Sequence, residues 1–190
     1  MSANIIKHPF WVVLLTSFIL AASPLSAQNL LSDPGFEAGT PNPSWAEAST
    51  NFSTPLCTTA SCGFGGGTGP YAGNWWAWFG GIGAYEASEV SQSVTIPNGT
   101  ASLSFWLEIP AGSGNSTDFM EVSIDNNPVF TVYENTPGYG TYTQVVLDIS
   151  SYADGNTHNL KFSSIIYGTG TTNFFVDDVE ILSNPTPLPV

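Results

Sequence analysis

The chain has 190 residues, of which 15 are Asp or Glu and only 2 are Lys or Arg, so its formal net charge is −13. A protein with so few cations cannot neutralise a run of phosphates, which argues against nucleic acid as a partner and against binding to anionic membrane surfaces. Two Cys and two His residues also leave little material for a zinc site or for imidazole catalysis.

The first 27 residues predict a secretory signal peptide. Lys7 precedes a nearly unbroken apolar run over residues 10–22, and the small residues of SPLSA follow, so we expect cleavage after Ala27. The apolar run is shorter than the ~20 residues that a bilayer-spanning helix needs, which disfavours a membrane anchor. We therefore expect a secreted protein, extracellular or at the cell surface, without membrane contact after cleavage.

The first part of the mature chain is irregular. Residues 29–39 (NLLSDPGFEAG) predict a short first strand. The glycine-rich stretch 62–73 (CGFGGGTGPYAG) lacks the Lys and Ser/Thr of a phosphate-binding loop, and no helical pattern follows it, so we expect a flexible connection. Cys57 and Cys62 are the only cysteines. A close pair in an oxidising compartment predicts a disulfide that closes a small loop.

From residue 89 onward the pattern is that of short β-strands. In 89–97, Val90, Val94 and Ile96 alternate with polar residues, and the Asn98-Gly99 pair then predicts a hairpin. Further strand-like segments are 100–110, 118–125, 128–134, 142–150, 157–167 and 172–182. Strands separated by such regular turns predict an all-β antiparallel sandwich or barrel, here one domain over residues 28–183. The alternating prolines of 184–190 predict an extended tail or linker.

No catalytic constellation stands out in this sequence. His158 is the only histidine of the mature chain, and because it directly follows the turn YADGN we expect it to pack against that turn. Neither cysteine stays free for nucleophilic attack if the disulfide forms, and no pair among the 15 acids is marked out for glycoside hydrolysis. We therefore expect no enzymatic activity.

The closing strand, TNFFVDDVEIL, carries two adjacent carboxylates. Strict alternation places Asp177 on the same face as Phe175, Val179 and Ile181, whereas Asp178 falls on the outer face. A carboxylate that points into a core needs a partner. A hard cation such as Ca²⁺ and hydrogen bonds from backbone amides are both able to fill that role, and the residues alone leave the two alternatives open.

Aromatic residues form a second candidate site. The stretch NWWAWFGG places Trp76 and Trp78 on one strand face, and Trp106 lies on the Ser/Glu face of its own strand. Tyr85 lies close to a loop. Exposed aromatic rings stack on the C–H faces of sugars, so these four residues are candidate sugar ligands. The alternative is that they are ordinary core and rim residues of a sandwich.

Several motifs in their order resemble jelly-roll modules of bacterial secreted proteins. They are NLLSDPGFEAG, WAWFGG, SQSVTIPNGTASLSFWL, DISSYADGNTHNLKF and NFFVDDVEI. The similar families are the galactose-binding-like and carbohydrate-binding modules and the MAM-like modules of immune-inhibitor-A-type proteins. The resemblance implies a jelly-roll β-sandwich. It also implies a structural Ca²⁺ that joins the first strand to the last through Glu37 and Asp177, with carbonyls near residues 72–74.

These observations lead to one main hypothesis and one alternative. The main hypothesis is a secreted, non-catalytic binding module for a polysaccharide or glycan, stabilised by calcium. The alternative is a cell-surface adhesion or protein-interaction module of the MAM-like kind within a larger secreted protein.

Overall fold

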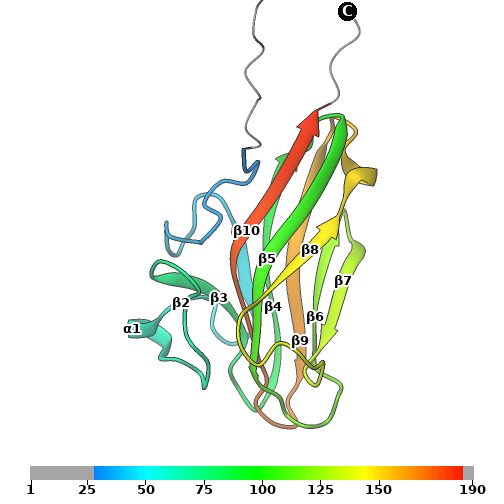
Figure 1. Cartoon of the computed structure of the whole chain (residues 1–190). Helices are drawn as coiled ribbons and strands as arrows, with labels where there is room; N and C mark the ends of the chain where they lie inside the picture. Colours follow the sequence, from blue (N-terminus) through cyan, green and yellow to red (C-terminus); the bar gives the residue numbers. More distant parts are fainter. Residues whose placement is uncertain (1–27, 186–190) are drawn as a thin grey trace, which may run out of the picture.

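The computed structural model describes residues 28–185. The predicted signal peptide and residues 186–190 of the predicted tail lie outside the described residues. Two five-stranded antiparallel sheets face each other, and both ends of the described chain lie at the same end of the sandwich (Figure 1). Within residues 28–185, no helix is long and apolar enough to cross a membrane.

The two sheets have the strand orders β1-β4-β9-β6-β7 and β2-β3-β10-β5-β8. We call them the first and the second sheet. The first sheet contains β1 (Ala46–Ser49), β4 (Tyr85–Thr95), β9 (Thr157–Tyr167), β6 (Phe119–Ile124) and β7 (Asn127–Tyr133). The second contains β2 (Leu56–Thr58), β3 (Trp75–Gly80), β10 (Asn173–Pro185), β5 (Gly99–Ala111) and β8 (Thr143–Asp148). Two short helical turns are α1 (Thr59–Cys62) and η1 (Ser150–Tyr152). The predicted antiparallel jelly-roll sandwich is confirmed.

The core fills the space between the sheets, as the alternating patterns predict. Val90 and Phe162 of the first sheet and Leu103 and Phe105 of the second are completely buried in one cluster. Trp45 joins them, because its ring packs against Phe162 at 6.5 Å between ring centroids. Each sheet therefore has an outer face that carries its remaining side chains, and these outer faces are where a ligand can bind.

The predicted hairpin at Asn98-Gly99 is wrong. β4 belongs to the first sheet and β5 to the second, so the chain crosses from one sheet to the other at this turn. Gly99 has a φ of +147° and donates its amide to the Ala153 carbonyl. Each of the two strands has one apolar face. The alternating sequence is equally consistent with a hairpin and with two strands that pack their apolar faces together from opposite sheets.

A β-bulge in β10 changes the predicted direction of Asp177. In the pairing with β5, Asp177 lies opposite Trp106 and Glu180 opposite Ser104, so β10 has one extra residue there. Asp178 takes up that residue with a φ of +46°. Phe174 and Val176 before the bulge, and Val179 and Ile181 after it, all face the core. Phe175 and Asp177 therefore point to the outer face of the second sheet, contrary to the predicted phase.

The N-terminal segment is joined to β10 by the Asn29 side chain and by backbone hydrogen bonds. The Asn29 carboxamide donates to the Val179 carbonyl at 3.0 Å and accepts from the Ile181 amide at 3.0 Å and the Leu31 amide at 3.1 Å. The Leu30 amide adds a backbone bond to the Ile181 carbonyl. Asn29 therefore fastens the first residues of the domain to its last strand.

We expect Asn29→Ala to lower the free energy of unfolding by about 1–3 kcal/mol, because it leaves the partners of a bound carboxamide unpaired. Denaturation in urea measures this change. Asn29→Asp keeps the acceptor oxygen but turns a second oxygen towards the Val179 carbonyl, so it should also be less stable than the wild type. A loss below about 0.5 kcal/mol for the Ala variant would contradict this role.

Candidate functional site

The outer face of the second sheet carries an aromatic cluster. Trp76 and Trp78 of β3 lie nearly parallel at 6.3 Å, and Phe175 of β10 meets both rings edge-on at 5.7 and 5.1 Å. The prediction that the two tryptophans share a face is confirmed. Trp76 is completely buried, however, and its indole nitrogen has no hydrogen-bond partner among the described residues. In this conformation its ring offers no surface to a ligand.

The glycine-rich segment 63–74 covers part of this face. It runs so close to the aromatic rings that a β-carbon on Gly65 would lie 2.3 Å from the Trp78 ring. The Tyr71 ring stacks on Trp106 at 4.0 Å. The Thr68 hydroxyl donates to Glu108 at 2.6 Å. The segment is thus packed against the sheet through ring contacts and hydrogen bonds, in contrast to the flexible connection that its composition predicts.

Two carboxylates hold the end of the glycine-rich segment. Asp177 accepts from the amides of Tyr71 at 2.8 Å and Ala72 at 3.1 Å. Glu37 accepts from the amides of Asn74 at 2.8 Å and Trp75 at 2.9 Å. Both predicted calcium ligands therefore bind successive parts of one turn, through its amide groups.

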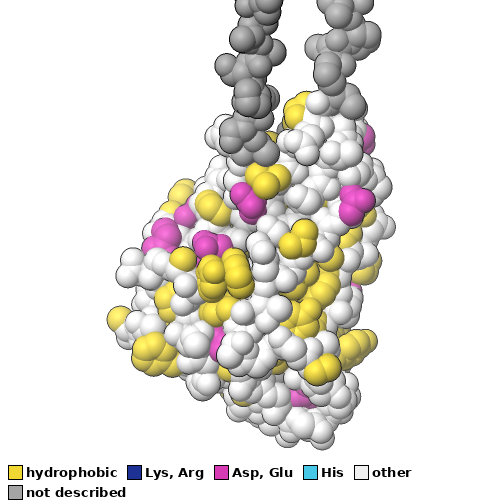
Figure 2. Space-filling model, viewed as in Figure 1, with side chains coloured by type: hydrophobic (Ala, Val, Ile, Leu, Met, Phe, Trp, Pro, Cys, Tyr) yellow, Lys and Arg dark blue, Asp and Glu magenta, His cyan; other side chains and the backbone are white. Residues whose placement is uncertain are grey.

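The electrostatic surroundings of Asp177 are unfavourable to a negative charge. Burial raises the pKa of Asp177 to about 7, and the neighbouring Asp178 adds to the rise although three backbone amides oppose it. Burial also raises the pKa of Asp178, and the charge of Glu37 acts in the same direction. No Lys or Arg is seen on the face that carries β10, β5 and β8 (Figure 2). This acidic group thus has no visible positive counter-charge.

The same residues fit a calcium ion in their chemistry. A β-carbon on Gly35 would lie 3.2 Å from Oδ1 of Asp178, 3.6 Å from Oδ1 of Asp177 and 3.8 Å from Cγ of Glu37. Gly35 therefore lets the backbone pass close to these carboxylates, whose oxygens are the ligand type that Ca²⁺ prefers. The described residues contain no ready-made group of three or more His, Cys, Asp or Glu ligands, so calcium stays a prediction.

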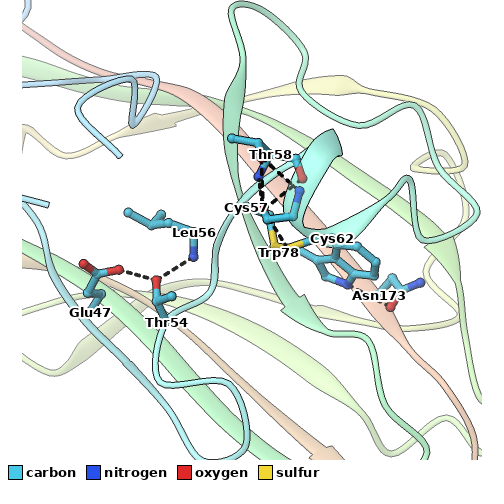
Figure 3. The surroundings of a disulfide bond; sticks show 9 residues. Glu47, Thr54, Leu56, Cys57, Thr58, Cys62, Trp78 and Asn173 are labelled. Carbon is cyan, nitrogen blue, oxygen red and sulfur yellow. Dashed lines mark hydrogen bonds between the residues drawn. A yellow bond between two sulfur atoms is a disulfide. The ribbon is translucent and has the colours of Figure 1, made fainter. Parts of the chain in front are cut away.

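The predicted disulfide between Cys57 and Cys62 is confirmed (Figure 3). It borders a groove on the protein surface. The groove has a volume of about 480 Å³. We call it the disulfide groove; it is lined by Thr40, Phe52, Thr54, Leu56, Cys57, Ser61, Cys62, Trp75, Trp78, Gly80 and Gly81. Phe52 is 50% exposed. Trp78 is half-buried, and its indole N–H donates to the side-chain amide oxygen (Oδ1) of Asn173 at 3.0 Å.

Glu47 organises the polar groups of the disulfide groove. It accepts the hydroxyl protons of Thr40, at 3.0 Å, and of Thr54. The Thr54 oxygen also accepts from the Leu56 amide at 2.9 Å, an arrangement visible in Figure 3. Because Glu47 takes both protons, the Thr40 oxygen is presented as an acceptor. The groove thus combines aromatic faces with an oriented hydroxyl, as sugar recognition requires.

The four predicted sugar ligands do not form one site. Trp76 is buried, Trp78 lines the disulfide groove, and Trp106 is half-buried beneath Tyr71. Tyr85 is 53% exposed and lies on the first sheet, whereas the three tryptophans lie on the second. Sequence reasoning missed Phe52, which follows an irregular run without alternation. Its aromatic character in a polar stretch was the only available signal.

Three of the buried polar groups elsewhere, His158, Asp118 and Glu134, have hydrogen-bond partners within the fold. The His158 ring lies between Asp125 at 2.7 Å and Asp154 at 2.9 Å, and the hydrogen bond to Asp125 raises its pKa. The side chains of Asp118 and Glu134 both bind the Thr172 hydroxyl. None of these residues lines the disulfide groove. The arrangement of His158 agrees with the expected turn-packing role.

Comparisons with known proteins place the fold. No protein-family model matches the sequence, and no curated protein matches it. The carbohydrate-binding module TmCBM61, solved with β-1,4-galactotriose, has a TM-score of 0.58 at 17% identity, over 83% of this chain and 99% of that one. The K1 cleaved adhesin domain of Lys-gingipain from Porphyromonas gingivalis W83 has a TM-score of 0.55 at 17% identity, over 79% and 96%. These likenesses show the fold that such modules share, and they confirm the predicted structural resemblance.

The raised pKa of Asp177 predicts a pH dependence of stability. The Asp177 carboxyl titrates near 3.8 in the unfolded chain and near 7 in the folded one, so the folded state binds more protons between these values. The contribution of Asp177 to stability is therefore greatest below about pH 4 and falls towards pH 7, by roughly 1.4 kcal/mol for each pKa unit of difference at most.

We expect Asp177→Asn, which cannot ionise, to flatten this fall when unfolding is measured in EDTA across that pH range. Glu121→Gln, on the first sheet, is the control. A slope unchanged by Asp177→Asn would contradict the assignment.

Proposed function

We propose that the protein is a secreted, non-catalytic carbohydrate-binding module that binds its ligand in the disulfide groove. The observation that carries the proposal is the groove itself, where Phe52 and Trp78 offer aromatic surface beside an oriented Thr40 hydroxyl. A pocket of this size suits a small number of sugar rings. Sugar C–H faces stack on aromatic planes, and their hydroxyls bind polar groups at the rim.

The rigidity of the groove supports this proposal. The disulfide closes its wall over a sequence separation of 5 residues, and α1 is capped by Thr58, whose hydroxyl accepts the Ser61 amide. Trp78 is fixed by its bond to Asn173, and Asn173 in turn donates to the Gly65 carbonyl at 2.6 Å. A preformed site loses little conformational entropy on binding, which favours weakly interacting ligands such as sugars.

A structural calcium ion is part of the proposal. Glu37 and Asp177 would hold it, with Asp178 beside them. Bound there, the ion would neutralise the repulsion among these carboxylates and join the N-terminal segment to β10. It would act on stability, since none of these residues lines the disulfide groove.

Binding in the groove is tested by a screen of soluble glycans and insoluble polysaccharides with the wild type and Phe52→Ala. We expect roughly tenfold weaker binding for the variant, because it loses one exposed stacking ring. Phe64→Ala is the matched control, since Phe64 is 57% exposed and does not line the groove. Equal affinity of Phe52→Ala and the wild type would refute the site. Binding of proteins alone would favour the interaction-module alternative.

Calcium binding is tested by thermal melting in Ca²⁺ and in EDTA. Saturation at a hundredfold excess over Kd adds about 2.7 kcal/mol to the free energy of unfolding, so Ca²⁺ should raise the melting temperature by several degrees. Glu37→Gln should remove most of this rise, whereas Glu121→Gln on the first sheet should keep it. A melting curve that EDTA leaves unchanged would sink the calcium proposal.

A further inference from the structure

An exposed row of aromatic side chains crosses the outer face of the first sheet. Tyr85 of β4 lies directly opposite Tyr167 of β9. Two residues along, Ile165 of β9 lies opposite Phe119 of β6, which lies opposite Tyr133 of β7. We call these residues the tyrosine row. It spans four neighbouring strands at one end of the sheet, which corresponds to about 14 Å across the strands.

The three tyrosines of the row are open to solvent. Tyr85 and Tyr167 are each 53% exposed, and Tyr133 is 47% exposed. Their strand neighbours Glu86, Ile166 and Val132 point the other way and are buried, so alternation holds the tyrosines outward. Within residues 28–185, no hydrogen bond is formed by the hydroxyls of the three tyrosines. Their rings and hydroxyls are both available to a ligand.

A line of hydrogen-bonding groups runs parallel to the tyrosine row. Two residues further along the strands, Glu89 pairs with Ser163, and Glu121 pairs with both Ser163 and Thr131. The only nearby cation is Lys161, whose Nζ atom lies 3.9 Å from Glu89. Carboxylates and hydroxyls accept hydrogen bonds from ligand hydroxyls, while the surplus negative charge repels acidic groups.

The combination favours one class of ligand. An apolar strip with a parallel strip of acceptors fits an extended chain that has C–H faces on one side and hydroxyls on the other. We propose that the tyrosine row is a second carbohydrate site, which binds an uncharged linear polysaccharide lying across the strands. Sulfated and uronic acid chains are excluded by Glu89 and Glu121.

The row lies next to the disulfide groove along the chain. The Asn51 side chain donates to the Tyr85 carbonyl at 2.8 Å, and Phe52 of the groove is the following residue. Phe52 of the groove and Tyr85 of the row are therefore connected through Asn51 at the start of β4. The row shares its ligand class with the proposed function but none of its residues, so each is tested by its own variants.

The test compares the wild type with the double variant Tyr133→Ala/Tyr167→Ala on insoluble neutral polysaccharides and on soluble oligosaccharides. We expect the double variant to bind the polymers at least about tenfold more weakly, because two stacking rings are lost. Short oligosaccharides that fill only the groove should bind unchanged. Phe64→Ala, at an exposed ring outside both sites, is the control.

The outcomes separate the two sites. Unchanged polymer binding by the double variant, with Phe52→Ala impaired, overturns the tyrosine row and leaves the groove in place. The reverse pattern supports the row and refutes the groove. Stronger binding of a uronic acid polymer than of a neutral one overturns the proposed ligand class. Sedimentation velocity gives a further test. If the wild type forms a dimer and the double variant does not, the carbohydrate proposal is overturned, because the row then binds a second copy of the chain.

Discussion

The arrangement of the second sheet depends on the bulge in β10. One extra residue at Asp178 reverses the phase of the strand, so that Val176 and Val179 both face the core. Asp177 is thereby turned outward, where amides of the glycine-rich segment surround it. Without the bulge, either the carboxylate or the apolar residues after it would lie on the wrong side of the sheet. The bulge therefore reconciles a buried charge with an intact core.

The glycine-rich segment determines which surfaces remain open to a ligand. It covers the aromatic cluster of the second sheet, and Tyr71 caps Trp106. This leaves the disulfide groove at the side of that sheet and the tyrosine row on the other sheet. Only residues without side chains are able to approach Trp78 as closely as Gly65 does. The composition that suggested flexibility is thus a requirement of close packing.

The sequence predicted the fold well because its strands are regular. Alternating residues such as Val90 and Leu103 mark the buried faces wherever the period of two is unbroken, and a cysteine pair in a secreted chain has few other uses. The prediction of side-chain direction failed where a single extra residue changes the register. Asp177 and Asp178 are the same residue type, and nothing in the sequence marks the bulge. The Asn98-Gly99 turn failed for a related reason, because local turn chemistry does not specify which sheet the next strand joins.

Exposure could not be predicted from the alternation of residues alone. Trp76 lies on the predicted outer face and is nevertheless buried, since a segment with no regular structure packs over it. The tyrosine row could not be predicted either, because Tyr85 and Tyr167 come from strands that are distant in sequence and adjacent in the sheet. Candidate sites of this kind depend on strand order, which periodicity does not encode.

The position of Lys161 has a consequence for the resistance of the domain to proteolysis. It is the only Lys or Arg in residues 28–185, and it lies in the middle of β9, hydrogen-bonded between β4 and β6. Proteases of the trypsin type cleave only after Lys or Arg, and they need an extended, accessible segment. Within residues 28–185, their one cleavage site is therefore enclosed in the centre of a sheet, where cutting requires the sandwich to open first.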